Sequence, residues 1–92
     1  MNNQNVIKTL KNIDDTVYTL YQENFNGEDY DVNVFGIAIE NLKESAYAPA
    51  ISTKLDEISN LFDLISSTTT YPCSLTEIVE DFVIWTYINF ML

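Results

Sequence analysis

The stretch DYDVNVFGIAIENL, residues 29–42, decides the fold class, because its apolar residues fit two different periods. Tyr30, Val32 and Val34 alternate with polar residues, as they do in a half-buried strand. The apolar residues that follow recur at the i, i+3, i+4 and i+7 spacing of an amphipathic helix. The residues at this helical spacing are Phe35, Ala38, Ile39 and Leu42.

Two further residues bear on the choice between helix and strand. Asp31 is a residue type that caps helix starts well. Gly36 weakens a helix by about 1 kcal/mol. The pattern favours a helix over residues 32–45, and a short strand near 30–35 followed by a helix is the alternative.

The chain before this stretch carries one apolar stripe at steps of three and four residues. This spacing predicts a helix over residues 4–23, which NFNG at 24–27 would end because Gly27 suits a left-handed turn. The stripe consists of Val6, Ile7, Leu10, Ile13, Val17, Leu20 and Tyr21.

The chain after this stretch predicts a connector and two helices. Residues 45–52 form the connector, because Pro49 lacks a backbone N–H. Apolar residues at helical spacing predict a helix over 53–66 and another from Ser74 nearly to the end. From Phe82 onward the last helix is apolar almost all round, so we expect it to lie in the core or against another chain.

These four segments predict a single all-α domain over residues 1–92, a compact bundle of about four helices. The alternative at the decisive stretch would make the domain α+β, with a short strand near residues 30–35.

Charge is the most unusual feature of the composition. Fourteen acidic residues stand against four lysines, the net charge is -10, and the chain has neither Arg nor His. Repulsion from phosphates disfavours direct binding to nucleic acid or to an anionic membrane. A basic protein partner is favoured instead, because opposite potentials steer association.

Cysteine content and hydropathy bear on location. The one cysteine, Cys73, excludes an intrachain disulfide and fits a reducing compartment. The longest apolar run, FVIWTYINFML, has eleven residues and is too short to span a bilayer. We therefore expect a cytoplasmic protein, in the host cell if the gene is carried by a phage.

The acidic segment ENFNGEDYD, residues 23–31, does not predict a metal site. Neither register of an EF-hand loop places a glycine and the oxygen ligands where the loop requires them. Without His, and with only two glycines, the chain offers no general base near neutral pH and no phosphate-binding loop. We expect no catalytic residues, no metal, no cofactor and no enzymatic activity.

The crowding of carboxylates is the chemistry that remains. Pairs such as Glu40 and Glu44 place like charges on one helical face, which costs a few tenths of a kcal/mol each. A rigid body with carboxylates at such intervals could imitate the charge density of DNA and occupy a basic groove. The expected partner contacts are Glu23, Glu28, Asp29, Asp31, Glu40, Glu44, Asp56, Glu57 and Asp63.

The aromatic C-terminal segment predicts self-association. It offers more apolar surface than one neighbouring helix covers, and a symmetric dimer would bury the excess. The residues expected in a homodimer contact are Phe82, Trp85, Tyr87 and Phe90.

Two segments resemble small acidic antirestriction and anti-CRISPR inhibitors of phages and plasmids. ESAYAPAISTKLDEISNLFDLIS, residues 44–66, is a Tyr/Pro connector leading into an acidic helix, and LTEIVEDFVIWTYINF, residues 75–90, is a helix with an aromatic end. In style they are most similar to the overcome-classical-restriction protein, an acidic helical dimer that imitates DNA. The resemblance covers about half of the chain and implies inhibition of a bacterial defence nuclease.

Two hypotheses of function follow. The first is an inhibitor that binds the basic nucleic-acid-binding surface of a restriction or CRISPR nuclease by charge mimicry. The second is an immunity-type or adaptor protein that binds one protein partner mainly through apolar contacts. Salt dependence separates them, since only the first relies chiefly on charge.

Overall fold

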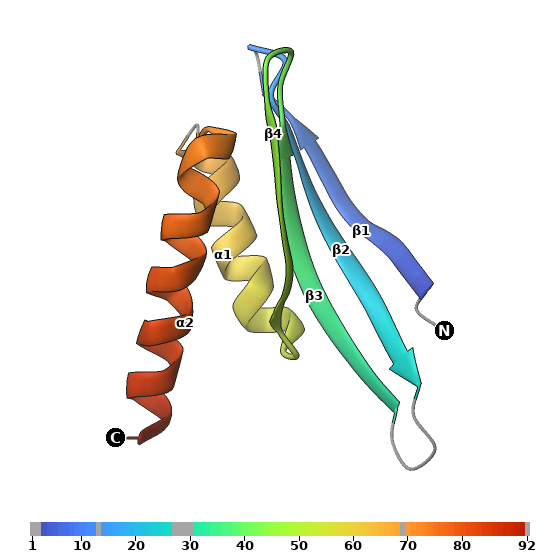
Figure 1. Cartoon of the computed structure of the whole chain (residues 1–92), viewed down its shortest axis with the longest axis vertical. Helices are drawn as coiled ribbons and strands as arrows, with labels where there is room; N and C mark the ends of the chain where they lie inside the picture. Colours follow the sequence, from blue (N-terminus) through green and yellow to red (C-terminus); the bar gives the residue numbers. More distant parts are fainter. Residues whose placement is uncertain (1–2, 13, 27–30, 69, 92) are drawn as a thin grey trace.

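The structure is a computed structural model that describes residues 3–12, 14–26, 31–68 and 70–91. It is α+β: an antiparallel sheet of four strands, in the order β1-β2-β3-β4, precedes two helices packed on one of its faces (Figure 1). The elements are β1 (Asn3–Lys11), β2 (Val17–Asn26), β3 (Asp31–Glu40), β4 (Ser45–Ser52), α1 (Leu55–Ser67), the 3-10 turn η1 (Pro72–Ser74) and α2 (Leu75–Met91).

The predicted all-α bundle is wrong in the first half of the chain. The helix expected over 4–23 is replaced by β1 and β2, and the helix expected over 32–45 by β3. The expected connector over 45–52 is β4. The alternative of a short strand near 30–35 is also wrong in extent, because β3 runs through to Glu40 and β4 follows it.

The two helices predicted in the second half are confirmed. The helix expected over 53–66 is α1, and the helix expected from Ser74 is α2. In α1 the amphipathic period persists over more than three turns. In α2 apolar residues recur at helical spacing from Leu75 to Ile88, although the second half of this helix is apolar almost all round.

Alternation of buried side chains explains why the central segments are strands. In β2, Tyr18 and Leu20 are each 1% exposed and point toward the helices. In β3, Phe35, Ile37 and Ile39 are buried in the same way. Along each of these strands the buried apolar side chains are separated by one residue, which is the period of a strand with one covered face.

The apolar stripe near the N-terminus was a coincidence of spacing. Val6, Ile7 and Leu10 lie on the edge strand β1, where each is more than a third exposed. A helical stripe would have buried these side chains together. The segment VYTLY at 17–21 is rich in β-branched and aromatic residues, which favour strand. The prediction from helical spacing did not take this preference into account.

The core lies between the sheet and the two helices. Tyr18 also links the layers, because its hydroxyl donates a hydrogen bond to the Thr70 carbonyl oxygen at 3.1 Å. Burial raises the pKa of the Tyr18 phenol. The buried apolar residues are Tyr18, Leu20, Phe35, Ile37, Ile39, Ile58, Leu61, Phe62, Ile65 and Leu75.

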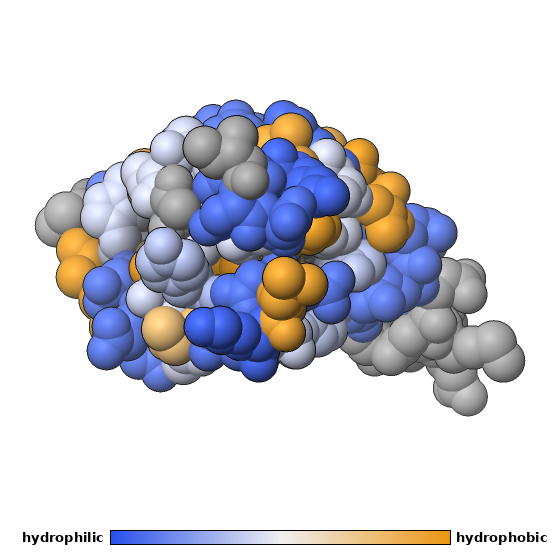
Figure 2. All heavy atoms as spheres, turned by 90° about the horizontal axis from the view of Figure 1, so that it is seen from above, coloured by the Kyte–Doolittle hydropathy of each residue, from blue (hydrophilic) through white to orange (hydrophobic). Residues whose placement is uncertain are grey.

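The two layers leave one face of the sheet uncovered by the described helices (Figure 1). This open face carries Thr19 and Tyr21 from β2, Ala38 from β3 and Tyr47 from β4, which are neighbours in the strand register. Seen from the end that holds the β1–β2 and β3–β4 turns, the surface is largely hydrophilic with separate apolar spots (Figure 2).

Candidate protein-interaction surface

An apolar groove lies between α1 and α2. Two overlapping hollows of about 260 and 310 Å³ are both lined by Leu61, Leu64, Phe82 and Trp85, and Ile78 lines the second. Leu61 and Phe82 pack toward the core, whereas Leu64 is 57% and Trp85 60% exposed. These five residues form the α1–α2 groove.

A second apolar surface lies on the side of α2 that faces away from the core. At 100° per residue, Leu75, Val79 and Phe82 fall on the side that packs on the core. The opposite side carries apolar residues in the C-terminal half of the helix. We name as the outer face of α2 the residues Val83, Ile84, Tyr87 and Ile88, which are between 45% and 64% exposed.

Charged side chains border the α1–α2 groove. Glu57 and Asp81 each line one of its two hollows. Lys54 lies near Trp85 and forms an ion pair with Glu57 at 3.9 Å. The outward side of α2 continues this acidic border in its first half, with Glu77 and Glu80 exposed.

The structure divides the residues predicted for self-association between these two surfaces. Phe82 and Trp85 line the groove, and Tyr87 lies on the outer face. The side chain of Phe90 lies outside the described part of the structure. The helical spacing of the aromatic residues predicted their part in a contact. Leu64, which lies on α1, was not predicted to take part in any contact.

The acids predicted to bind a basic partner fall into separate groups. Glu23 and Glu40 lie on the open sheet face, where the register pairs them with Val34 and Val17. They are six residue positions apart along the strands, about 20 Å. Glu28 and Asp29 lie outside the described residues.

The other acids lie elsewhere or are engaged. Asp31 accepts a hydrogen bond from Asn24 Nδ2 at 2.8 Å, and Glu44 lies in the β3–β4 turn. Asp56, Glu57 and Asp63 belong to α1, in the other layer; Asp63 pairs with Lys8 at 3.4 Å. The described acids therefore do not share one face, which the helical bundle would have allowed.

The described residues were also searched for a metal site and for a membrane-spanning helix. Within them, no three acidic or cysteine side chains are grouped closely enough to hold a metal ion. No helix in the same ranges has the length and hydropathy to cross a membrane.

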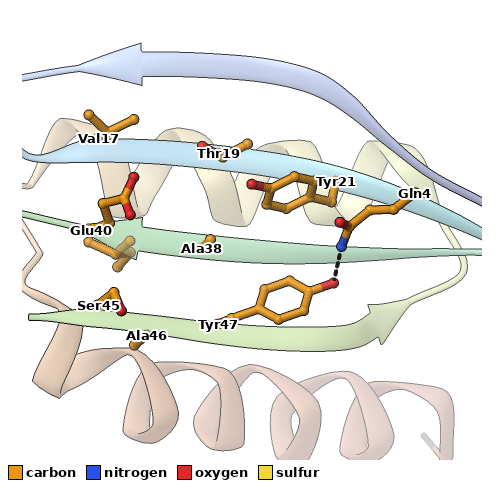
Figure 3. A pocket seen from close by; sticks show the side chains of 10 residues that line it. Gln4, Val17, Thr19, Tyr21, Ala38, Glu40, Ser45, Ala46 and Tyr47 are labelled. Atoms are coloured by element: carbon orange, nitrogen blue, oxygen red, sulfur yellow. Dashed lines mark hydrogen bonds between the residues drawn. The ribbon is translucent and has the colours of Figure 1, made fainter.

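A hollow on the open sheet face was not predicted from the sequence. It is about 320 Å³ in volume and is bordered by Tyr21, Glu40 and Tyr47 (Figure 3). These residues come from three strands, one of which was expected to be a connector, so only the strand register brings them together.

The chain belongs to the family of unknown function DUF6514, which matches residues 1–84. Comparison with curated proteins and with solved structures gave no match.

Proposed function

We propose that this member of the family is a non-enzymatic binding protein that takes an apolar helix of a partner protein into the α1–α2 groove. The observation that carries the proposal is the exposure of Leu64 and Trp85, each more than half exposed beside the core residue Leu61. Contiguous apolar surface of this kind marks interaction sites in monomeric proteins. The groove has side chains of α1 on one side and of α2 on the other, and such a groove suits an amphipathic helix laid into it.

The border of the groove favours a partner helix with basic flanks. Glu57 and Asp81 line the groove, and the chain as a whole carries a net charge of -10. Lysine or arginine residues beside the apolar face of the partner would meet these carboxylates. Rim charges of this kind speed association more than they strengthen the complex.

We also propose a cytoplasmic location. Cys73 is an exposed free thiol, which is compatible with a reducing compartment.

Affinity capture from cells of the source organism, with a matched pair of variants, tests the groove. Leu64→Asp places a charge in the groove, and Leu42→Asp places the same charge at a 91% exposed leucine in the β3–β4 turn. We expect one protein to be captured by the wild type and by Leu42→Asp and to be lost with Leu64→Asp. Equal capture by the two variants would contradict the proposal.

The salt dependence of that capture addresses a second candidate, the inhibitor that occupies the basic surface of a defence nuclease. Its support is the net charge of -10 together with the absence of Arg. Capture through the groove should persist between about 0.1 M and about 1 M salt, whereas capture by charge mimicry should be lost. Replacing Asp31, Glu44, Asp56 and Asp63 by Lys should abolish binding only under the second candidate.

A further inference from the structure

The open sheet face contains a hollow whose shape follows from the side chains of β3. Ala38 lies in register between Thr19 on β2 and Tyr47 on β4. Its methyl group fills little of the space between the longer side chains on both sides, and a hollow of about 320 Å³ remains above it. Figure 3 shows two tyrosine rings at one end of this hollow and Glu40 at the other.

The aromatic end is held by contacts across three strands. The rings of Tyr21 and Tyr47 meet edge to face, with centroids 5.6 Å apart and planes at 78°. The Tyr47 hydroxyl donates a hydrogen bond to Glu23 Oε1 and accepts one from Gln4 Nε2 at 2.9 Å. These contacts orient the Tyr47 ring and place it against the Tyr21 ring without a ligand.

The charge of the hollow is negative and unbalanced. Among the described residues that line it, Glu40 is the one with a charge. Within the described residues, its carboxylate has no ion pair or hydrogen bond. Lys11 lies on the same face two strands away, and it pairs with Asp15 at 3.3 Å.

We propose that this hollow binds an arginine side chain of a partner polypeptide. The guanidinium lies over Ala38, with the Glu40 carboxylate on one side and the rings of Tyr21 and Tyr47 on the other. A planar guanidinium donates a fork of hydrogen bonds to a carboxylate and stacks on aromatic rings, which the ammonium of lysine does not do. The missing basic lining argues against a phosphate or nucleic-acid ligand.

The residues that line the hollow include Thr19, Ala38 and Tyr47 on the open face of the sheet. Both helices lie on the other face (Figure 1), so this inference stands independently of the α1–α2 groove. Groove variants test one surface and hollow variants the other. Failure of either proposal leaves the other untouched.

Titration by nuclear magnetic resonance tests the inference. The probe is the peptide acetyl-Gly-Arg-Gly-amide, and its two controls carry citrulline, which keeps the shape without the charge, or lysine. We expect the arginine peptide to shift the amide signals of Thr19, Ala38 and Tyr47, and the citrulline peptide to leave them unchanged. Equal shifts with the citrulline or the lysine peptide would overturn the assignment.

Protein variants complete the test. Glu40→Gln should weaken binding of the arginine peptide at least about tenfold, since it removes the charged half of the pair. Glu44→Gln removes a carboxylate from the nearby turn, outside the residues that line the hollow, and should leave the affinity unchanged. Ala38→Leu, which fills the hollow without changing charge, should also abolish binding while the dispersed spectrum shows that the fold persists. Equal weakening by Glu40→Gln and Glu44→Gln would show general charge attraction and refute the site.

Discussion

Gly36 shows how closely β3 and β4 approach. A Cβ built on Gly36 would lie 2.7 Å from the carbonyl oxygen of Ala48 and 3.0 Å from the Cα of Pro49. The contact arises where the register shifts between Phe35 and Ile37, beside the bulge in β4. Both neighbouring atoms are backbone, so they cannot turn aside as a flexible side chain would.

Gly36→Ala is therefore expected to destabilise the fold by about 1–3 kcal/mol, the usual cost of overpacking. Urea denaturation of the variant and the wild type measures this difference. Ala38→Gly, two residues along the same face, serves as control and should cost only about 0.5–1 kcal/mol. Unchanged stability of Gly36→Ala would contradict the close approach.

Tyr47 offers a second prediction at the level of one residue. Burial, followed by the hydrogen bond to Glu23, raises the pKa of Tyr47 from 10.0 to about 12. The neutral phenol is thus favoured by the folded state, and its contribution to stability is complete below pH 10.0 and lost as pH approaches about 12.

Glu23→Gln should lower the pKa of Tyr47, because it removes the carboxylate that accepts the hydrogen bond of the phenol and repels the phenolate. Ring signals of Tyr47 followed across pH give the value directly. Glu44→Gln is the matched control and should leave the Tyr47 titration in place. A Tyr47 that titrates like free tyrosine in the wild type would rule out the network.

At the scale of elements, the two helices were predictable and the four strands were not. α1 keeps one apolar stripe over several turns, and α2 has apolar residues at helical spacing over a length too great for a typical strand. The segments VYTLY at 17–21 and VFGIAI at 34–39 are short and hold apolar residues on both faces. Val17 and Tyr21 lie on the open face beside Thr19, so apolar residues occur on both faces of β2 and the alternation of polarity is blurred. Periodicity alone could not then separate a strand from a buried helix.

The same elements differ in what their apolar residues contribute to stability. Phe62 on α1 is 0% exposed, whereas Ile84 on α2 is 57% exposed. Phe62→Ala should cost about 3–5 kcal/mol through lost burial and a cavity. In dilute, monomeric protein, Ile84→Asp should change the free energy of unfolding by no more than about 0.5 kcal/mol. Thermal or urea unfolding distinguishes them, and a large loss with Ile84→Asp would mean that the outer face of α2 is covered within the monomer.

At the scale of the whole molecule, charge and the apolar surface of α2 occupy different places. Residues 82–92 contain no charged side chain in a chain of net charge -10. Two copies could therefore meet at the outer face of α2 with less repulsion than elsewhere. The composition indicated an acidic protein with an exposed aromatic segment. The groove could not be predicted, because it forms where Leu64 of α1 lies close to Trp85 of α2, and no local sequence pattern encodes that proximity.

Self-association through the outer face is the corresponding prediction. Sedimentation of the wild type at high micromolar concentration should show a species of twice 10.6 kDa. Ile84→Asp should return the protein to the monomer, while Leu42→Asp should not. A wild type that stays at 10.6 kDa under these conditions would contradict the prediction.

The fluorescence of Trp85 tests the central claim most directly, because it is the only tryptophan of the chain and lines the α1–α2 groove. The captured partner, or a tryptophan-free version of it, is added to dilute protein and the emission is compared with that of the protein alone. Occupation of the groove by an apolar helix predicts a shift of the Trp85 emission to shorter wavelength, retained with Leu42→Asp and lost with Leu64→Asp. A partner that binds with full affinity while the Trp85 emission stays unchanged would contradict the claim that the groove is its docking site.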